Sequence, residues 1–382
     1  MTTTTTRTTT TRSARRAATV EASYDEARRR SDRIEQLVAG PDCPERRRLR
    51  VLTGDRPTGR LHVGHYLASL RNRVALQDAG IETFVLVADH QVVTDRDAVG
   101  AIGEHVREML LDHLAAGIDP ERATIFAHSA VPALNQLMLP FLALVTLAEL
   151  ERNPTVKDEL AATAGRPLSG LLLTYPVHQA ADILFCGATV VPVGRDQLPH
   201  LEQARVIARR FNARFAGGRQ VFTEPDALLG TAPLVLGTDG RKMGKSGGNA
   251  IPLGATPDET ATLVRGARTD PERRITFEPD RRPEVASLLR IAAGFIGEDP
   301  AALAEAIGDG GAVRLKQVVT EAVNEGLAAH RARRAELARE PGHLARVLAE
   351  GNERANLIAE DRLRQVREVM GMDYRRALAA TP

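Results

Sequence analysis

The chain has 382 residues, 43% of them hydrophobic, which is enough for a sizeable core and for two domains. Its formal charge of +2 gives no global basic field for DNA, and no apolar run approaches the roughly 20 residues that a membrane helix needs. Its two cysteines, Cys43 and Cys186, lie far apart, which argues against a disulfide framework or a cysteine zinc site and suits a reducing cytoplasm.

The first 48 residues differ in texture from the rest. The opening "MTTTTTRTTTTR" holds nine threonines and no acid, so it cannot build a core. We predict disorder over residues 1–20, with a transit peptide as the competing interpretation. From Val20 to Val38 the apolar spacing becomes loosely helical, which predicts an appended helix, followed by a linker at "GPDCPERRR".

Residues 49–249 show strands that alternate with helices. Short apolar runs predict strands at 49–54, 83–89, 124–129 and 188–194. The stretches between them include predicted helices at 99–117 and 132–152. Strands that are apolar throughout and alternate with helices are typical of a parallel sheet covered on both faces. We therefore predict an α/β, Rossmann-like doubly wound domain that binds its ligand at the carboxyl ends of the strands.

Residues 250–382 lack strand patterns and predict an all-α domain. Amphipathic helices are expected at 258–268, 284–297, 311–338 and 353–371. The helix expected at 353–371 has the option of packing back on the domain of residues 49–249.

The first motif is "HVGH", which follows the first predicted strand. His62 and His65 stand at i and i+3, so their side chains face the same way at the start of a helix. A helix N-terminus offers unpaired N–H groups and a partial positive charge, and Gly64 lets a ring or phosphate approach the backbone closely. The histidines could instead be core residues or metal ligands. Because no further residues at metal-site spacing lie nearby, we predict no metal site.

The second motif is "KMGKS", residues 242–246. The chain holds 47 arginines but only four lysines, and two of these, Lys242 and Lys245, fall within this motif. Lysine carries a mobile point charge on a flexible stem, which suits it for reaching phosphates. The alternative is a solvated surface turn.

The two motifs together resemble class I aminoacyl-tRNA synthetases. The segments "TGDRPTGRLHVGHYLASL", "YPVHQAADILF" and "VPVGRDQ" narrow this resemblance to the tryptophanyl and tyrosyl subgroup. The fuller wording is similar to the bacterial tryptophanyl enzymes from about Leu49 to the C-terminus.

The resemblance implies a reaction, partners and site residues. The expected enzyme activates L-tryptophan with ATP and Mg²⁺ to tryptophanyl-adenylate, transfers it to tRNA(Trp), and forms a homodimer. The implied catalytic residues are His62, His65, Lys242, Lys245 and Ser246. The implied ATP-binding residues are Arg56, Gly64, Gly194, Asp196 and Met243. The implied tryptophan-binding residues are Gln91, Tyr175, Gln179, Asp182 and Gln197. An acceptor-only carboxylate at Asp182 suits the donor-only indole N–H.

Four positions depart from the family pattern. Gly244 stands between the lysines where serine is usual, which removes a hydroxyl donor and loosens the loop. Gln91 and Gln179 replace a histidine and an apolar residue near the expected indole pocket, which predicts a more polar pocket. Arg195 stands where an acid is common. These departures and the N-terminal extension suggest an auxiliary or inhibitor-resistant second copy.

Several alternatives stay open from the sequence. They are tyrosyl activation on the same fold, a small-molecule adenylyltransferase, and a catalytically weak paralogue that senses tryptophan. Two basic clusters either contact RNA phosphates or are solvated helix faces. One comprises Arg205, Arg209, Arg210 and Arg214, and the other is "HRARR" at 330–334.

Overall fold

The computed structural model describes residues 24–94, 101–154, 156–157, 169–230, 235–245, 248–374 and 378. They fall into two compact units. The first unit draws on residues 1–52, 134–230 and 361–382, and the second on 53–133 and 231–360. The predicted domain boundaries at residues 48 and 249 do not coincide with these divisions. The predicted disorder of residues 1–20 lies outside the described residues.

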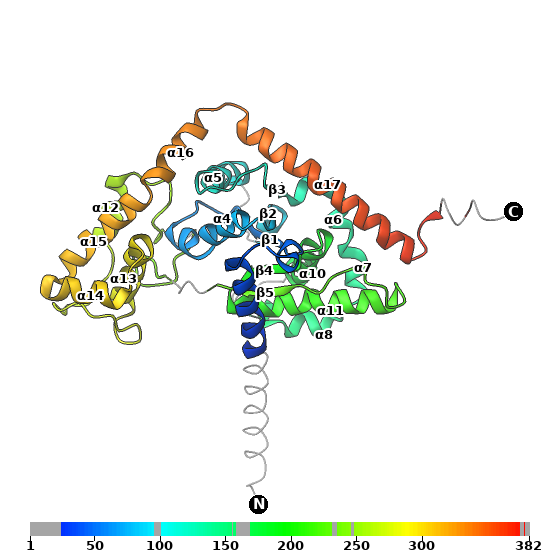
Figure 1. Cartoon of the computed structure of the whole chain (residues 1–382), viewed down its shortest axis with the longest axis horizontal. Coiled ribbons are helices and arrows are strands. Elements are labelled where there is room, and N and C mark those ends of the chain that lie inside the picture. The colour runs from blue at the N-terminus through cyan, green and yellow to red at the C-terminus, as the bar shows by residue number, and fades with distance from the viewer. Residues whose placement is uncertain are drawn as a thin grey trace, which may run out of the picture. The chain divides into compact units, whose positions relative to one another are not determined.

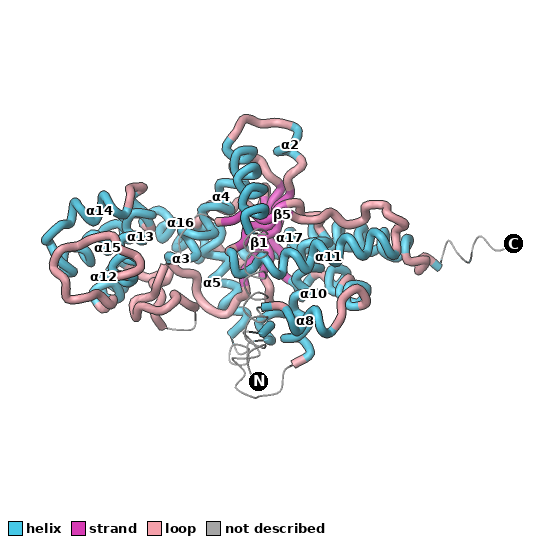
Figure 2. Tube along the Cα trace, turned by 90° about the horizontal axis from the view of Figure 1, so that it is seen from below, coloured by secondary structure: helices cyan, strands magenta, loops and turns pink. Residues whose placement is uncertain are grey.

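A parallel sheet forms the α/β core, as predicted. Its strands are β1 (Arg50–Asp55), β2 (Glu82–Val87), β3 (Ala123–Ala127), β4 (Val190–Val193) and β5 (Asp226–Leu229). They lie in the order β3-β2-β1-β4-β5, with β1 in the centre and the connections crossing over on either side of it. The strands appear together in magenta in Figure 2. This order is that of a doubly wound sheet, so the residues that follow each strand lie at a ligand-binding edge.

The four predicted strands are confirmed, whereas β5 was not predicted. Its sequence, "DALL", is short and rich in residues that favour helices. Pairing with β4 in parallel, from Val190 with Asp226 to Val193 with Leu229, makes it a strand.

In the first unit, the prediction of one helix over residues 132–152 was wrong. The stretch forms α6 (Pro132–Gln136), α7 (Met138–Leu142) and α8 (Leu147–Arg152). Pro140 has no N–H to bond to the carbonyl of Gln136, and a capping box begins α8, where Glu149 N–H donates to Thr146 Oγ1 at 3.3 Å.

Two longer helices and an aromatic core complete the first unit. Helices α10 (Gly170–Phe185) and α11 (Leu198–Arg214) pack against each other. The rings of Phe141, Phe211 and Phe222 meet edge-on, with centroids 4.8–6.3 Å apart. A short helix, α2 (Pro44–Arg47), precedes β1.

The second unit combines β2 and β3 with most of the C-terminal helices. These are α12 (Pro257–Arg265), α13 (Pro283–Ile296), α14 (Pro300–Ile307), α15 (Gly311–Gly326) and α16 (Ala328–Ala338). Helices α12 to α15 pack together as a group, shown in yellow-green to gold in Figure 1, and α16 packs on α5 (Ile102–Ala115). The helix expected over 311–338 is divided at Leu327 into α15 and α16. None of the described helices is both long and apolar enough to cross a membrane.

The last helix, α17 (His343–Val369), lies directly on β3. Asn352 Oδ1 accepts the N–H of Ala127 at 2.9 Å, and Arg354 donates to the carbonyl of Pro120 at 2.7 Å. Contact is closest at Gly351, where an added Cβ would stand 1.8 Å from the carbonyl oxygen of Ile125. Only glycine lets the helix backbone approach the strand this closely.

Replacing Gly351 with alanine should therefore destabilise the fold. The new methyl group must push α17 away from β3, and overpacking of this kind costs about 1–3 kcal/mol. Thermal or urea unfolding followed by circular dichroism measures the loss. Gly103→Ala in α5 is the matched control, because a Cβ there meets nothing within 4 Å. That control should be neutral or slightly stabilising, and equal effects of the two changes would contradict the close packing of α17.

Candidate functional site

The predicted site residues divide between the two units. The second unit holds Arg56, His62, Gly64, His65, Gln91, Lys242, Met243 and Lys245. The first unit holds Tyr175, Gln179, Asp182, Gly194, Asp196 and Gln197. Ser246 lies outside the described residues.

The two motif histidines begin the first helical stretch after β1. His62 is the N-cap of α3 (Val63–His65), which continues through η1 (Tyr66–Leu70) into α4 (Arg71–Asp78). Their ring centroids lie 3.8 Å apart, and the N–H of His62 points to Nδ1 of His65 at 3.4 Å. A Cβ on Gly64 would stand 3.1 Å from the His62 ring, so glycine leaves room for this pair.

Both histidines are neutral at pH 7. Burial, followed by the charge of Lys245, lowers the pKa of His62 to about 4. Burial also lowers the pKa of His65 to about 3, although the negative charge of Asp55 opposes the shift. A neutral imidazole keeps one N–H donor and one acceptor nitrogen. The pair can therefore donate hydrogen bonds to an anion without itself carrying charge.

A largely buried, ionised carboxylate lies close to the motif residues of the second unit. Asp55 ends β1, where its Oδ2 accepts from Arg73 Nη1 at 2.6 Å and lies 3.3 Å from His113 Nε2. Burial alone raises the pKa of the Asp55 carboxyl, but the charge of Arg73, the hydrogen bond from His113 and the charge of Lys245 hold it well below its usual value. Its charge in turn opposes the lowering of the Lys245 pKa by burial. Asp55 therefore favours the charged form of that lysine.

The lysine loop returns to the segment that precedes the histidines. Lys245 Nζ donates to the carbonyl of Arg56 at 2.8 Å. A Cβ on Gly59 would stand 3.0 Å from the Cβ of Lys245, so Gly59 permits this approach. Lys242 is exposed and pairs through its backbone with Leu236.

Asn249 holds the shape of the lysine loop. Its Oδ1 accepts the N–H of Gly244 at 3.1 Å, while its Nδ2 donates to the carbonyl of Lys242 at 3.1 Å and to Asp239 at 2.8 Å. Gly244 itself has open space where a side chain would stand. A buried amide thus supplies the cross-links that keep Lys242 and Lys245 in one loop.

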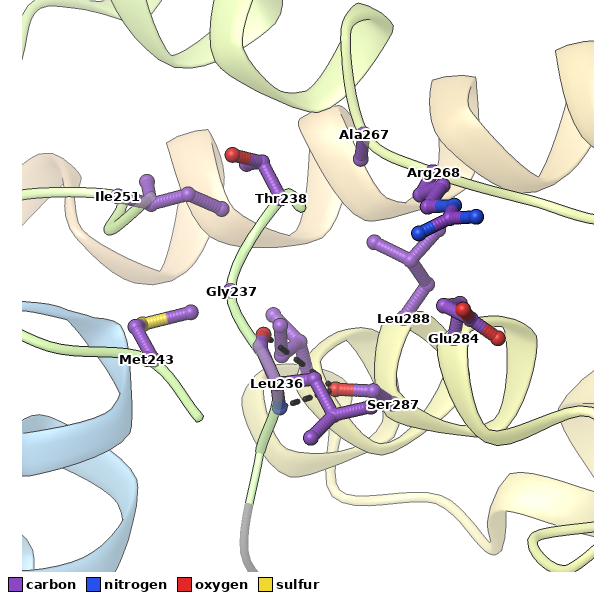
Figure 3. Close-up of a pocket in the computed structure, with 11 residues that line it drawn as sticks. Leu236, Gly237, Thr238, Met243, Ile251, Ala267, Arg268, Glu284, Ser287 and Leu288 are labelled. Carbon is purple, nitrogen blue, oxygen red and sulfur yellow. Dashed lines mark hydrogen bonds between the residues drawn. The ribbon is translucent and has the colours of Figure 1, made fainter. Parts of the chain in front are cut away.

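Met243 anchors the same loop in the apolar core. Met243, which stands between Lys242 and Lys245 in the sequence, is buried. It shares a small pocket with Leu236 and Ile251, as Figure 3 shows. Ser287 of α13 accepts the N–H of Leu236 at 2.7 Å, which fixes the segment leading into the loop. The burial of Met243 leaves its neighbours as the side chains that can reach a ligand.

In the first unit, α10 carries three predicted residues on one face. Tyr175, Gln179 and Asp182 stand at i, i+4 and i+7, and Asp182 is only 1% exposed. The Tyr175 hydroxyl lies 3.3 Å from His200 Nε2, whose imidazole has a pKa lowered to about 4 chiefly by burial. This face combines an aromatic ring, an amide and a buried carboxylate, which suits a flat heteroaromatic ligand with a polar N–H.

The loop after β4 carries the other predicted residues of the first unit. Gly194 follows the strand, and Arg195–Gln197 form a short turn, η5, that leads into α11. A Cβ at Gly194 would stand 2.6 Å from Asp196 Oδ1, so glycine allows this carboxylate to fold back. Gln197 Nε2 donates to Asp196 Oδ2 at 3.2 Å. This loop stands at the carboxyl end of a central strand, where doubly wound sheets bind ligands.

Both arginine clusters are engaged within the chain. In α11, Arg205 pairs with Asp226 at 2.9 Å, Arg209 with Glu202 at 2.9 Å, and Arg210 with Glu149 at 2.6 Å. In the 330–334 cluster, Arg331 donates to Thr260 at 2.8 Å, and Arg334 pairs with Asp112 at 2.9 Å. The structure therefore engages these side chains in ion pairs and hydrogen bonds within the chain.

Sequence reasoning missed Asp55, Arg73, His113 and Asn249. For Asp55 a signal was present, because it stands at the carboxyl end of the first strand, directly before the "RPTG" turn. Its partners Arg73 and His113 come from separate helices, and their convergence required the fold. Asn249 lies three residues after the KMGKS motif, but only the structure shows that its amide cross-links the loop.

The chain is similar to known proteins over most of its length. Residues 44–328 match the family described as tRNA synthetases class I (W and Y). A tryptophan–tRNA ligase of Clostridium longisporum is 42% identical over 85% of this chain and 97% of its own length. One from Treponema pallidum is 41% identical over 86% and 98%. A Campylobacter jejuni tryptophanyl-tRNA synthetase, solved with ADP and tryptophan, is 28% identical, with a TM-score of 0.72 over 85% of this chain and 100% of its own.

The lowered pKa values of the motif histidines predict a pH dependence. Folded pKa values of about 4 and 3 lie below the value of about 6.5 expected in the unfolded chain. The unfolded state therefore binds more protons between these values, and this contribution to stability is full above pH 6.5 and falls as the pH drops. Urea unfolding at pH 7 and at pH 5 measures the free energy of unfolding. Its decrease between these two pH values should be smaller for the double variant His62→Gln/His65→Gln than for the unmodified chain. An imidazole titration near pH 6.5 by NMR would contradict the assignment.

Proposed function

The chain belongs to the class I tRNA synthetases of the W and Y group, and we propose that it is a tryptophan–tRNA ligase of the cytoplasm. Two tryptophan–tRNA ligases that are more than 40% identical over nearly their whole lengths support this choice. One observation carries the chemistry. Two neutral histidines at a helix N-terminus share a compact unit with Lys245, whose ammonium reaches back to the turn that precedes them.

In the proposed first step, the carboxylate of tryptophan attacks the α-phosphorus of ATP. A carboxylate–phosphate bond forms, the bond to the β-phosphate bridging oxygen breaks, and pyrophosphate leaves with the electron pair. Because the substrate supplies the nucleophile, the enzyme needs mainly to align the reactants and stabilise the developing charge. In the second step, a ribose hydroxyl of the tRNA terminal adenosine attacks the activated carbonyl, and AMP leaves.

His62, His65, Lys242 and Lys245 are proposed to act on the phosphates. Neutral imidazole N–H groups would donate to phosphate oxygens, while the ammonium groups would offset the charge of the leaving pyrophosphate. Gly64 would allow the adenine to approach the backbone, and Arg56 and the backbone of Met243 would complete the proposed ATP-binding residues of the second unit. Gly194 and Asp196 are the proposed ATP-binding residues of the first unit. Ser246 is a further proposed catalytic residue.

Mg²⁺ is proposed to arrive with ATP and to supply charge neutralisation at the phosphates. Mg²⁺ favours carboxylate oxygens together with substrate phosphates. The carboxylate that acts electrostatically on His62, His65 and Lys245 is Asp55, and it is already held by Arg73 and His113. Asp55 therefore does not fit as a magnesium ligand, and we propose no protein carboxylate for that role.

Tryptophan is proposed to bind against α10 and the loop after β4. Asp182 would accept the indole N–H, and Tyr175 and Gln197 would hold the substrate ammonium. Gln179 would make the pocket more polar than is usual in the family, in line with an auxiliary or inhibitor-resistant copy. Gln91 of the second unit is a further proposed tryptophan-binding residue. The tyrosyl alternative would need groups that recognise a phenol hydroxyl instead.

tRNA(Trp) and a second copy of the chain are the proposed macromolecular partners. Because the arginine clusters of α11 and α16 are engaged internally, we assign the anticodon contact to neither. Light scattering after gel filtration should give twice the 41.3 kDa chain mass.

The decisive test is amino-acid-dependent exchange of pyrophosphate into ATP. We expect exchange with tryptophan and none with tyrosine. Activity with tyrosine and silence with tryptophan would replace the proposal by the tyrosyl alternative. Tryptophan binding without exchange would show a sensor, and charging of tRNA(Trp) should accompany exchange if both steps occur.

Loss of the Lys245 ammonium should lower the rate of tryptophan activation strongly. Removing one preorganised electrostatic group from a transition state costs about 10²–10³ in kcat, so Lys245→Ala should lose activity on this scale while keeping its fold. Lys316→Ala is the matched control, because Lys316 is a surface lysine of α15 that donates to the carbonyl of Arg265. Equal rates for both variants would remove Lys245 from the mechanism.

Gln179→Met should change which indole analogues inhibit the enzyme most strongly. If the amide lines the indole pocket, its removal should tighten inhibition by apolar indole analogues and weaken inhibition by analogues with polar ring substituents. Inhibition constants in pyrophosphate exchange measure the shift, with Gln203→Met of α11 as the control. Unchanged ratios between the two classes of analogue would place Gln179 outside the pocket.

A further inference from the structure

The appended N-terminal helix contacts the loop Gly194–Gln197 after β4, which is called the substrate loop from here on. This helix, over residues 24–39, lies outside the family match, which begins at residue 44. We propose that it is a positioning element, in which Tyr24 and Arg195 set the geometry of the Gly194–Gln197 loop and thereby the affinity for ATP. The inference rests on the proposed function, and it assigns this part of the chain a role in substrate binding.

The helix is firmly docked on the edge of the sheet. Its buried residues Ala27, Ser31 and Ile34 stand at helical spacing, and Ser31 is completely buried. Ser31 Oγ accepts the N–H of Leu229, the last residue of edge strand β5, at 2.8 Å. A serine that satisfies an edge-strand N–H marks a specific covering of that edge.

A second contact fixes the rotation of the helix. Arg30 Nε lies 3.2 Å from Asp226 Oδ1 at the start of β5, and Arg205 of α11 shares this carboxylate at 2.9 Å. Contacts at both ends of one strand allow the helix little freedom to slide. Its N-terminal residue in the described chain, Tyr24, is therefore held in a defined place.

Tyr24 meets the substrate loop directly. The guanidinium carbon of Arg195 lies 4.2 Å from the centroid of the Tyr24 ring, a cation–π geometry. Arg195 stands between Gly194 and Asp196, the two residues proposed to bind the ribose of ATP. Arg195 thus gives the loop a cation that the appended helix holds.

Release of this contact should loosen the loop and weaken ATP binding. An exposed cation–π contact of about 0.5–1 kcal/mol corresponds to a change of about two- to fivefold. In Tyr24→Ala, the KM for ATP should rise by about this factor, while kcat changes less than twofold. Tyr24→Phe keeps the ring and should restore the normal KM. Arg195→Leu should match Tyr24→Ala, and the double variant should be no worse than either single variant.

Hydrogen exchange gives a readout that does not depend on activity. In the full-length chain, Tyr24→Ala should increase deuterium uptake in a peptide covering residues 194–198, and Tyr24→Phe should not. Arg28→Ala is the control, because Arg28 pairs with Asp32 within the same helix. Thermal unfolding should be the same for all variants, which separates a local effect from a loss of fold.

The outcomes distinguish this inference from the proposed function. If Tyr24→Ala leaves deuterium uptake at residues 194–198 unchanged, the inference is overturned, whatever the activity of the enzyme. Increased deuterium uptake at residues 194–198 with an unchanged KM for ATP overturns the role in substrate binding. A wild-type chain that is silent with tryptophan overturns the proposed function, while the exchange data still decide whether Tyr24 holds the loop.

Discussion

The ion pair between Asp55 and Arg73 places a charged group beside the histidine and lysine motifs of the second unit. The carboxylate is largely buried at the end of the central strand, where burial alone would favour its neutral form. Arg73, His113 and Lys245 outweigh that effect and keep it ionised. Buried ion pairs add little net stability, because desolvation offsets their attraction. The value of this pair lies in its field, which favours a charged Lys245 while burial keeps His62 and His65 neutral.

Around this charge, the phosphate-binding motifs depend on small residues and one amide. Gly59 and Gly64 give Lys245 and His62 the space that a side chain would fill. Asn249 cross-links the backbone of the lysine loop, and Met243 ties the loop to the apolar core. The loop thus keeps its form although Gly244 supplies no side chain. A Cβ at Gly244 would meet nothing within 4 Å, so sterics do not require glycine there.

Much of the fold could be predicted from sequence because the central strands are apolar throughout and separated by helices. Strand β5 could not, since "DALL" has no intrinsic strand signal and depends on pairing with β4. The division of the stretch at 132–152 into three helices was missed, although Pro140 and the Thr146 capping box were visible signals. The site followed the same pattern. The motif residues were predicted, while Arg73 and His113, which hold Asp55, were not.

The sequence by itself determined the chemistry available to this protein. Residue types at short spacings, such as His62 with His65 and Lys242 with Lys245, are properties of the local chain and can be recognised without a structure. Tertiary structure alone decided the protonation of those groups, because burial and charge come from residues distant in sequence. It also decided the place of the appended helix, since the Leu229 N–H that Ser31 accepts belongs to a strand formed only by pairing. The contact of Tyr24 with Arg195 joins residues 171 positions apart, and no local pattern in the sequence encodes such a distance.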